Sequence, residues 1–389
     1  MIDRLEILEF ARELGLTPEI VEKDYVLGWL LGGIFNHPAL QSTWLFKGGT
    51  CLKKCYFETY RFSEDLDFTL RNPEHLTQEF LDTTFPEVAG WIYERCGIEM
   101  PPDTITFEIY ANPRGKLSVQ GRIGYRGPLQ RRGSIPRIKL DLTDDERIVL
   151  DPIWREVHHP YSDRPGDGIQ AFCYRYEELF AEKIRALAER MRPRDLYDVI
   201  HLYRHDAAGC DRELVLQTLG EKCNFKGIPV PDADSLANSP ERAELESEWE
   251  NMLVHQLPVV PPLAHFFGEL PRVFSWLVGI LAREILPAIP AGADEDASWR
   301  PPAMASSWGT VVPLETIRFA AANHLCVDLS YQGTHRLIEP YSLHRTRDGN
   351  IMLHAIRHDS GDHRSYRVDR IEGVSATRTS FMPRYSVEL

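Results

Sequence analysis

The order of apolar and polar residues predicts alternating helices and strands over most of the chain. In residues 176–189 apolar positions recur at helical spacing and would form one buried face of an amphipathic helix. In residues 65–70 apolar and polar residues alternate, which is typical of a strand with one buried face. The predicted helices cover 5–35 (a pair, broken at 15–18), 50–57, 176–189, 195–203, 240–257 and 263–286, and the predicted strands cover 43–46, 65–70, 104–110, 116–125 and 137–142.

The pattern changes after residue 309. Short alternating runs predict strands over 325–331, 336–343, 350–357 and 365–371, with turns at Gly333, Gly349 and Gly361. Residues 287–309 are rich in Pro, Ala, Gly and Ser, and this composition predicts a linker. We therefore expect an α+β protein with a core (1–225), a helical extension (226–286), the linker (287–309) and a small β-domain (310–389).

Composition narrows the class of protein. The net charge of −14 over 389 residues argues against a protein that coats nucleic acid non-specifically, although a local basic face remains compatible with it. The apolar run after residue 265 is interrupted by Glu269, Pro271 and Arg272, so we expect no membrane span. Seven cysteines without a CxxC pair, and a first segment unlike a signal peptide, predict a cytoplasmic protein with reduced thiols. Cys51 and Cys55 are expected on a buried helix face.

The stretch KGGTCLKKCYFETYRFSEDLDFTL, residues 47–70, holds the strongest candidate chemistry. On a strand, Asp65 and Asp67 point to the same face. Two carboxylates so close repel each other unless a cation lies between them, and Mg²⁺ is a natural partner. Gly48, Gly49 and Thr50 could bring backbone N–H groups and a hydroxyl to a phosphate. Each half alone is also compatible with a plain structural reading, a solvated strand face for the aspartates and a capped turn for the glycines.

Four motifs in order resemble one family. FKGGTCLKKCY, RFSEDLDF, AEKIRAL and RPRDLYDV, preceded by EKDYVLGWLL, resemble the AbiEii/AbiGii toxins, which are nucleotidyltransferases of the DNA polymerase β type. The resemblance covers residues 5–285 and implies a core of a mixed sheet flanked by helices. Within EKDYV, we expect Glu22 and Lys23 to be solvated.

The resemblance assigns roles to further residues. The superfamily uses a third carboxylate on a neighbouring strand, for which Asp141 in IKLDL is the candidate, and Lys139 shares its face. Lys183 matches the family's conserved lysine, and Phe180 stands where some members have Thr. The implied catalytic residues are Asp65, Asp67, Asp141, Lys183 and Asp195; the implied metal ligands are Asp65, Asp67 and Asp141; the implied nucleotide-binding residues are Lys47, Gly48, Gly49, Thr50, Lys139 and Lys183.

Structural alternatives stand beside these assignments. Asp141 could be an exposed strand residue, and Lys183 could pair with Glu178 or Glu182. Asp195 could cap a helix. Asp198, the second aspartate of the family's DxxD, could have no role beyond pairing with a nearby arginine.

The resemblance implies a Mg²⁺-dependent enzyme with two ions that transfers NMP from an NTP to an acceptor hydroxyl. The acceptor would be an RNA, with a tRNA 3′ end as the leading hypothesis and a protein as the second. The protein would be the toxin of a type IV toxin–antitoxin or abortive-infection (phage defence) system with a cognate antitoxin. A basic stretch, residues 109–140, could steer RNA; equally, it could offset the acidic remainder or bind an acidic partner. Its cations are Arg114, Lys116, Arg122, Arg126, Arg131, Arg132, Arg137 and Lys139.

Residues 315–377 resemble a WYL domain, a small SH3-like β-barrel found in bacterial regulators. The resemblance rests on EPYSL, the Asp-Gly hairpin and RVDRI, although Ile351-Met352-Leu353 replaces the name-giving triplet. It implies a nucleotide or nucleic-acid ligand, and a non-catalytic sensor is therefore the alternative function. The candidate contacts are Arg336, Arg357, Arg364, Arg367 and Arg370, which could instead pair with Asp359, Asp362 and Asp369.

Overall fold

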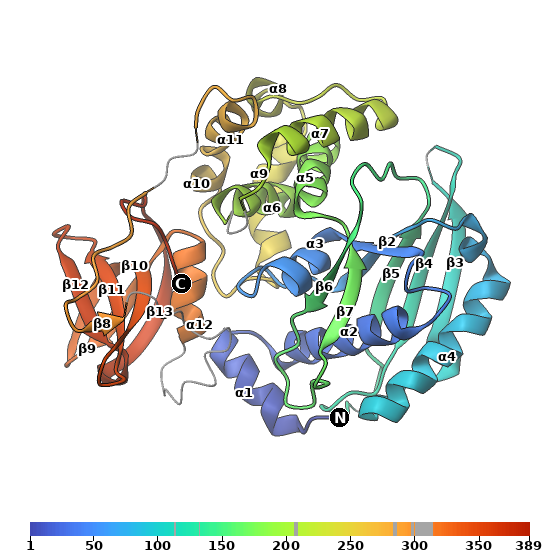
Figure 1. The fold of residues 1–389 in the computed structure, drawn as a ribbon, viewed down its shortest axis with the longest axis horizontal. Coiled ribbons are helices and arrows are strands. Elements are labelled where there is room, and N and C mark those ends of the chain that lie inside the picture. The colour runs from blue at the N-terminus through green and yellow to red at the C-terminus, as the bar shows by residue number, and fades with distance from the viewer. Residues whose placement is uncertain (113, 132, 206–208, 283–285, 297–298, 300–313) are drawn as a thin grey trace. The chain divides into compact units, whose positions relative to one another are not determined.

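The computed structural model describes residues 1–112, 114–131, 133–205, 209–282, 286–296, 299 and 314–389 (Figure 1). The chain forms two compact units, each of which is described by itself. The first comprises 1–11, 16–185 and 213–230, and the second comprises 12–15, 186–212 and 231–389. The domain boundaries expected from the sequence stay a prediction. Among the described residues, no helix is both long and apolar enough to cross a membrane.

A mixed sheet of seven strands forms the first unit's centre (Figure 1). Its order is β3-β4-β5-β2-β1-β7-β6, in which β2 runs parallel to β5 and antiparallel to β1. The five predicted strands of this part are confirmed, whereas β6 and β7 were not predicted. The strands are β1 (Trp44–Lys47), β2 (Asp65–Leu70), β3 (Ile105–Ala111), β4 (Leu117–Gly124), β5 (Arg137–Thr143), β6 (Ile153–Val157) and β7 (Ile169–Cys173).

Helices cover this sheet, so its mixed, helix-flanked architecture is confirmed. Helix α2 packs against β7 and α4, and it is apolar nearly all round because it is buried on most sides. The glycine pair opens α3, which continues directly as a short π-helix, Leu52–Tyr56. The helices are α1 (Arg4–Leu14), α2 (Pro18–Asn36), α3 (Gly48–Cys51), α4 (Gln78–Cys96), α5 (Tyr176–Arg190) and α7 (Arg212–Lys226), of which α4 and α7 were not predicted.

The burial of α2 overturns one expectation about its polar residues. Glu22, which we expected to be solvated, is 1% exposed, and its carboxylate accepts a hydrogen bond from the Leu129 N–H at 2.7 Å. Burial raises the pKa of Glu22 despite this bond. The expectation is wrong because the segment around Leu129, which is distant in sequence, packs over Glu22 and shields it from solvent.

The helical part of the second unit differs from the prediction at one place. We expected one apolar helix over 263–286, and the chain instead forms two short ones, α10 and α11. Gly268 separates them, Pro271 lies in the first turn of α11, and Gly279 adopts φ +77°, where a helix cannot continue. The helices are α6 (Pro193–Arg204), α8 (Ala233–Ala237), α9 (Arg242–Leu253), α10 (Leu263–Phe267) and α11 (Leu270–Leu277).

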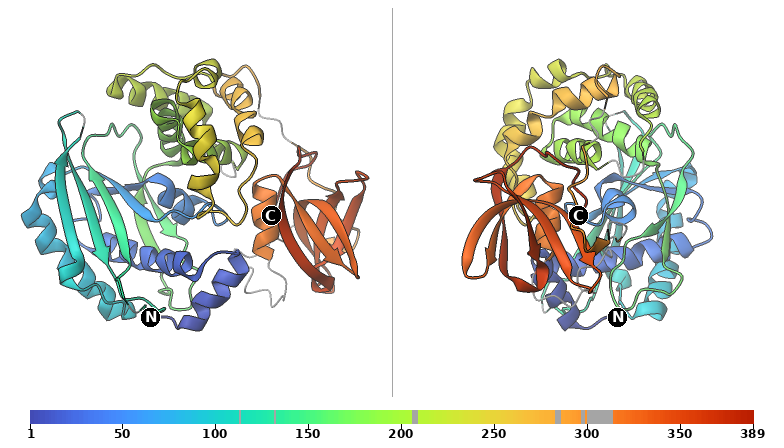
Figure 2. Two further views of the ribbon diagram at one scale, coloured as in Figure 1. Left: turned by 180° about the vertical axis from the view of Figure 1, so that it is seen from behind. Right: turned by 60° about the vertical axis from the view of Figure 1, so that its left-hand side comes forward.

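An antiparallel sheet with one covering helix forms the rest of the second unit (Figure 2). The order is β12-β11-β10-β9-β13, and the short β8 pairs with β10. Within the described residues the outer strands β12 and β13 are not paired with each other, so a closed barrel is not confirmed. The elements are β8 (Glu295–Asp296), α12 (Leu314–Ala322), β9 (Leu325–Tyr331), β10 (Thr334–Thr346), β11 (Ile351–Arg357), β12 (His363–Arg367) and β13 (Ile371–Ser380).

The position of β8 corrects the linker prediction in part. Glu295 and Asp296 lie within 287–309, where we expected no regular structure, and they pair with Thr346 and Arg345. Most of the remaining residues of that range lie outside the described residues. A two-residue strand has no periodicity of its own, so only its partner strand could reveal it.

Candidate active site

One face of β2 and β5 gathers the predicted carboxylates. In the parallel register Asp65 lies beside Lys139 and Asp67 lies beside Asp141, while Lys47 of β1 is the antiparallel neighbour of Asp67. The residues between them, such as Leu66 and Leu140, are fully buried on the opposite face. The alternation that predicted a shared face is therefore confirmed, and the sheet adds the third carboxylate beside the first two.

Burial and crowding both act on the carboxylates of this face. The pKa of Asp67 is raised to about 6, chiefly by burial and further by the nearby Asp141, although Lys47 opposes the rise. Lys139 binds Asp141, with Nζ 2.6 Å from Oδ2. Burial acts to lower the pKa of Lys139, but this contact raises it overall. One more positive charge nearby would oppose the effect of burial and favour the ionised form of Asp67.

The glycine pair lies directly against this face. Gly48 has φ +79°, and a Cβ placed there would come within 2.1 Å of Asp67 Oδ2. A Cβ on Gly49 would come within 2.5 Å of the guanidinium of Arg61. Gly48 therefore has neither the backbone conformation nor the space for a side chain, whereas a side chain at Gly49 would have to displace the end of Arg61. The Thr50 hydroxyl donates a hydrogen bond to the backbone carbonyl of Asp65, and its predicted phosphate contact stays a prediction.

Arg61 is a candidate that the sequence analysis missed. It is 2% exposed and lies over Gly49, within the same motif that supplies Asp65. The available signal was its place four residues before the first aspartate. A buried guanidinium beside the glycine pair suits an anionic ligand, because arginine binds phosphate oxygens through several N–H groups at once.

Lys47 and Lys183 supply positive charge beside the carboxylates. Lys47 Nζ lies 3.2 Å from Glu182 Oε1 and 3.8 Å from Glu146 Oε1. Burial would lower the pKa of Lys47, but these glutamates and Asp67 raise it, so the amine stays charged. Lys183 is also buried, and its charge acts to lower the pKa of Asp67. Both predicted lysines therefore act electrostatically on the same carboxylate.

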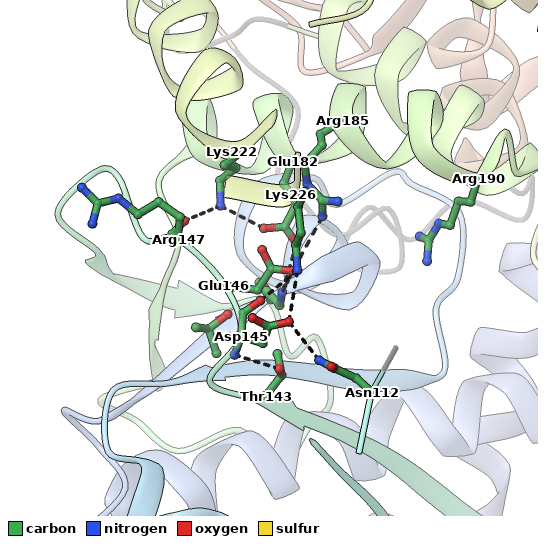
Figure 3. Close-up of polar contacts among 12 residues, drawn as sticks. Asn112, Thr143, Asp145, Glu146, Arg147, Glu182, Arg185, Arg190, Lys222 and Lys226 are labelled. Carbon is green, nitrogen blue, oxygen red and sulfur yellow. Dashed lines mark hydrogen bonds and ion pairs between the residues drawn. The ribbon is translucent and has the colours of Figure 1, made fainter. Parts of the chain in front are cut away.

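A buried network of glutamates and lysines holds α5 in place (Figure 3). From α7, Lys222 Nζ lies 3.2 Å from Glu182 and 3.0 Å from Glu178, and Lys226 Nζ lies 3.1 Å from Glu146. Burial would raise the pKa of Glu182, but Lys47, Lys222 and Arg185 lower it strongly. The sequence analysis missed this network, although Glu178 and Glu182, like Lys222 and Lys226, lie four residues apart on one helix face.

Asp195 and Asp198 are both fully buried in the second unit. Both oxygens of Asp195 accept hydrogen bonds from the Arg190 guanidinium, at 2.7 and 2.9 Å. The N-cap of α6 is Arg192, so Asp195 is not the capping residue that the structural alternative required. A bidentate pair fixes the orientation of both side chains. The predicted catalytic role of Asp195 stays a prediction.

The basic stretch of residues 109–140 is largely paired within the first unit. Described ion pairs join Arg114 to Asp145, Arg122 to Glu108, Arg126 to Glu99, Arg131 to Glu19 and Glu22, and Lys139 to Asp141. Arg132 lies outside the described residues. These contacts favour the alternative in which the stretch offsets neighbouring acidic groups.

Three buried cysteines lie together in the first unit. Cys51 and Cys55 are buried, as predicted, and Cys173 of β7 lies beside them. The local sequence pattern gives no sign of Cys173 at this place, because it lies 118 positions after Cys55.

The residues of the β2–β5 face fit a divalent cation. Asp65, Asp67 and Asp141 offer carboxylate oxygens, which are the ligands that Mg²⁺ prefers. Burial, and after it the neighbouring Asp141 and Asp65, raise the pKa of Asp67, although Lys47 and Lys183 act to lower it. These three residues would hold the ion, and its positive charge would favour their ionised forms.

In the C-terminal sheet, three candidate arginines have acidic partners close in sequence. Arg357 binds Asp359, Arg364 binds Asp362 at 3.1 Å, and Arg367 binds Asp369 at 2.6 Å. Arg336 donates to the Tyr331 carbonyl at 2.7 Å. The alternative in which these arginines pair with the hairpin aspartates is confirmed for all three aspartates.

The comparisons with known proteins agree with the class of enzyme that the site suggests. Residues 29–278, well over half of the chain, match the family described as nucleotidyl transferase AbiEii toxin of the type IV toxin–antitoxin system, and residues 313–376 match the WYL domain. The protein is a nucleotidyltransferase. The chain belongs to the AbiEii toxin family, whose members use an NTP and a divalent metal ion and are countered by an antitoxin. A comparison with curated protein sequences gave no match.

Several solved structures are similar in part. MenT4, a nucleotidyltransferase toxin from Mycobacterium tuberculosis H37Rv, is 20% identical with a TM-score of 0.49, and the match covers 72% of this chain and 91% of that one. JHP933 from Helicobacter pylori is 16% identical with a TM-score of 0.42, and the match covers 67% of this chain and 93% of that one.

Proposed function

We propose that the protein transfers NMP from an NTP to an RNA 3′ hydroxyl in a Mg²⁺-dependent reaction, with the β2–β5 face as its active site. The observation that carries this proposal is the convergence of Asp65, Asp67 and Asp141 against the glycine pair, with the pKa of Asp67 raised to about 6. A surface of solvated aspartates would not raise this pKa by burial or face a backbone with no room for a Cβ.

The residues around the carboxylates divide the work of the transfer. Lys183, Lys47 and Arg61 would neutralise the triphosphate, and Gly48 and Gly49 would let it approach the backbone. The acceptor oxygen bonds to the α-phosphorus, the bond to pyrophosphate breaks, and the hydroxyl proton passes to solvent. Bound at the three aspartates, Mg²⁺ would lower the pKa of the acceptor hydroxyl and stabilise the leaving pyrophosphate; two ions are expected from the superfamily.

The acceptor within this proposal is RNA, with a tRNA 3′ end first and a protein second. The net charge of −14 and the paired state of the basic stretch leave few cations for a broad nucleic-acid surface. Binding only the end of an RNA requires fewer cationic side chains than binding along a duplex does.

The test is label transfer from each α-labelled NTP, with Mg²⁺, to total tRNA and to total protein from a bacterial lysate. Label is expected in tRNA with the native protein and not with Asp67→Ala. Asp103→Asn is the matched control, because Asp103 is an exposed carboxylate outside the site, and it should transfer label normally. Label in protein alone would show that the acceptor is a protein and not RNA. No label in either fraction would overturn the proposed transfer to both classes of acceptor.

The toxin role is tested in cells. Induced expression of the native chain is expected to arrest growth, and Asp67→Ala is expected to relieve the arrest at equal protein level. Co-expression of a cognate antitoxin should relieve it without any substitution. Arrest by Asp67→Ala as strong as that of the native chain would contradict a catalytic origin of toxicity, and would favour the sensor function of the WYL domain.

A further inference from the structure

Three segments of the C-terminal sheet bring two imidazoles to one carboxylate oxygen. Glu295 Oε2 of β8 lies 3.0 Å from His344 Nδ1 of β10 and 2.8 Å from His354 Nε2 of β11. The backbone N–H of Gly292 donates to the same oxygen at 2.9 Å. His354 is 1% exposed and His344 is 6% exposed, so the cluster is almost closed to solvent.

Hydrogen bonds alone account poorly for this arrangement. A carboxylate oxygen has two lone pairs, and here three N–H groups would have to share one oxygen atom. Both imidazoles would also have to carry their proton on the nitrogen that faces Glu295.

We propose that Glu295, His344 and His354 form a binding site for a transition-metal dication of the Zn²⁺ type. Two imidazole nitrogens and one carboxylate oxygen are a ligand set of zinc sites with one open position for water. Ligands at Zn–N and Zn–O distances of about 2.1 Å in a tetrahedron lie roughly 3.4 Å apart. The two ligand separations in the cluster, 3.0 and 2.8 Å, need to lengthen by only about half an ångström.

The surroundings of His354 fit a metal ligand. Its other nitrogen, Nδ1, lies 3.1 Å from His363 Nε2 and 3.2 Å from Ser365 Oγ on β12. When a histidine binds metal through one nitrogen, the N–H on the other is held by a polar group that fixes the ring. His363 and Ser365 supply two such groups, so the ring of His354 is fixed from the side away from Glu295.

A second cluster of two histidines and one glutamate lies in the same unit but is less suited to a metal ion. His265, Glu269 and His324 also lie within ligand distance of one another. There the Arg204 guanidinium binds Glu269. Burial, and after it the charge of Arg204, lowers the pKa of both histidines. A guanidinium already neutralises Glu269 and would repel a dication. At Glu295 the described partners are imidazoles and one backbone N–H, which leave room for a dication's charge.

A metal at this place would fasten β8 to the sheet. Glu295 and Asp296 pair with the end of β10 through only two residues. A metal bond between Glu295 and histidines on β10 and β11 would join three chain segments that are about 10 to 60 residues apart in sequence, and would stabilise the sheet as structural zinc does.

The test uses the full chain with Asp67→Asn, which weakens the β2–β5 site, after removal of metal by a chelator. Zn²⁺ is titrated by calorimetry and Co²⁺ by visible absorption, because Co²⁺ bound by nitrogen ligands in a tetrahedral site absorbs strongly. We expect one ion per chain. Glu295→Gln and His354→Gln in the same background should bind at least about tenfold more weakly. His335→Gln is the control, because His335 is an exposed histidine of the same sheet, and should bind normally.

Thermal unfolding keeps the proposal testable if a variant fails to fold. Zn²⁺ should raise the unfolding temperature of the Asp67→Asn chain by about 3 °C or more, and Mg²⁺ at the same concentration should not. Absence of both the Co²⁺ absorption and the temperature shift in this chain would overturn the proposal. Unchanged binding in folded Glu295→Gln and His354→Gln would also overturn it, because the ion would then lie elsewhere.

Discussion

The two sheets of this protein carry charged side chains at the same short spacing and treat them in opposite ways. On β2, Asp65 and Asp67 are two residues apart and carry the same charge, and burial with a third carboxylate raises the pKa of Asp67. In the C-terminal sheet, Arg367 and Asp369 are also two residues apart, but their charges are opposite and they bind each other at 2.6 Å. The β2 face keeps two like charges side by side, whereas the Arg367–Asp369 pair neutralises its own charges.

This difference indicates which charged face is a site. An ion pair at the surface contributes little to the free energy of folding, and its charges are already neutralised without a ligand. A crowded, partly buried set of like charges, such as Asp65, Asp67 and Asp141, becomes more favourable when a ligand of opposite charge binds. The structure therefore favours the β2–β5 face over the C-terminal arginines as the place where a highly charged substrate and its metal bind.

The largest expected change is in the kcat/KM of a variant at Lys183, which lies by the β2–β5 face. Lys183→Met should lower kcat/KM for the NTP by roughly 10–100-fold, since a hydrogen bond to a charged group contributes about 1.5–3 kcal/mol. The measurement is label transfer over a range of NTP concentrations. Arg364→Gln, which removes an exposed arginine from the other sheet, serves as the control. An unchanged kcat/KM for Lys183→Met would remove this lysine from the triphosphate site.

The acid limb of the pH profile tests the charge of Asp67. At low Mg²⁺, kcat/KM should fall about tenfold per pH unit below about 6, because the metal must displace the proton that Asp67 holds there. Raising Mg²⁺ should move the limb to lower pH. A limb near the usual aspartate pKa at every Mg²⁺ concentration would mean that the carboxylates are not crowded as described.

A smaller effect is expected on the free energy of unfolding of the metal-free protein. Removing the charge of Asp67 should stabilise the protein. The folded-state pKa of Asp67 is raised, so its contribution to stability is present below its unfolded pKa and is lost as pH rises through about 6. Asp67→Asn should therefore stabilise the chelator-treated protein by about 1–2 kcal/mol at pH 8 and not at pH 4. Denaturant unfolding at the two pH values measures this. Destabilisation at pH 8 would show that the carboxylate is already neutralised.

The smallest effect is expected in the C-terminal sheet. Arg367→Gln removes a surface ion pair and should change the free energy of unfolding by no more than about 0.5 kcal/mol. Label transfer should stay normal. A loss of more than about 2 kcal/mol would show that these pairs hold the sheet together, and the contrast between the sheets would then fail.

The sequence could predict what depends on local periodicity. The alternation in β2 and β5 placed Asp65, Asp67 and Asp141 on polar faces, and the motif order indicated that these faces belong to one site. Arg61 was missed although it lies in the same motif as Asp65, because nothing in the local pattern shows that its side chain is buried against Gly49. The Glu182–Lys222 pair was missed because its two residues lie 40 positions apart in the chain. The helix expected over 263–286 was wrong because apolar composition outweighed the breaks at Gly268 and Gly279. Strand β8 was missed because two residues carry no period.

The most direct measurement is a crystal structure of the full chain with Mn²⁺ and a non-hydrolysable NTP analogue, in which anomalous scattering locates the ions. The account predicts manganese bound by oxygens of Asp65, Asp67 and Asp141, with the phosphates of the analogue beside Gly48 and Lys183. It also predicts that the Arg367–Asp369 pair stays intact without an ion. Manganese away from the three aspartates, with the analogue held by the C-terminal arginines, would contradict it.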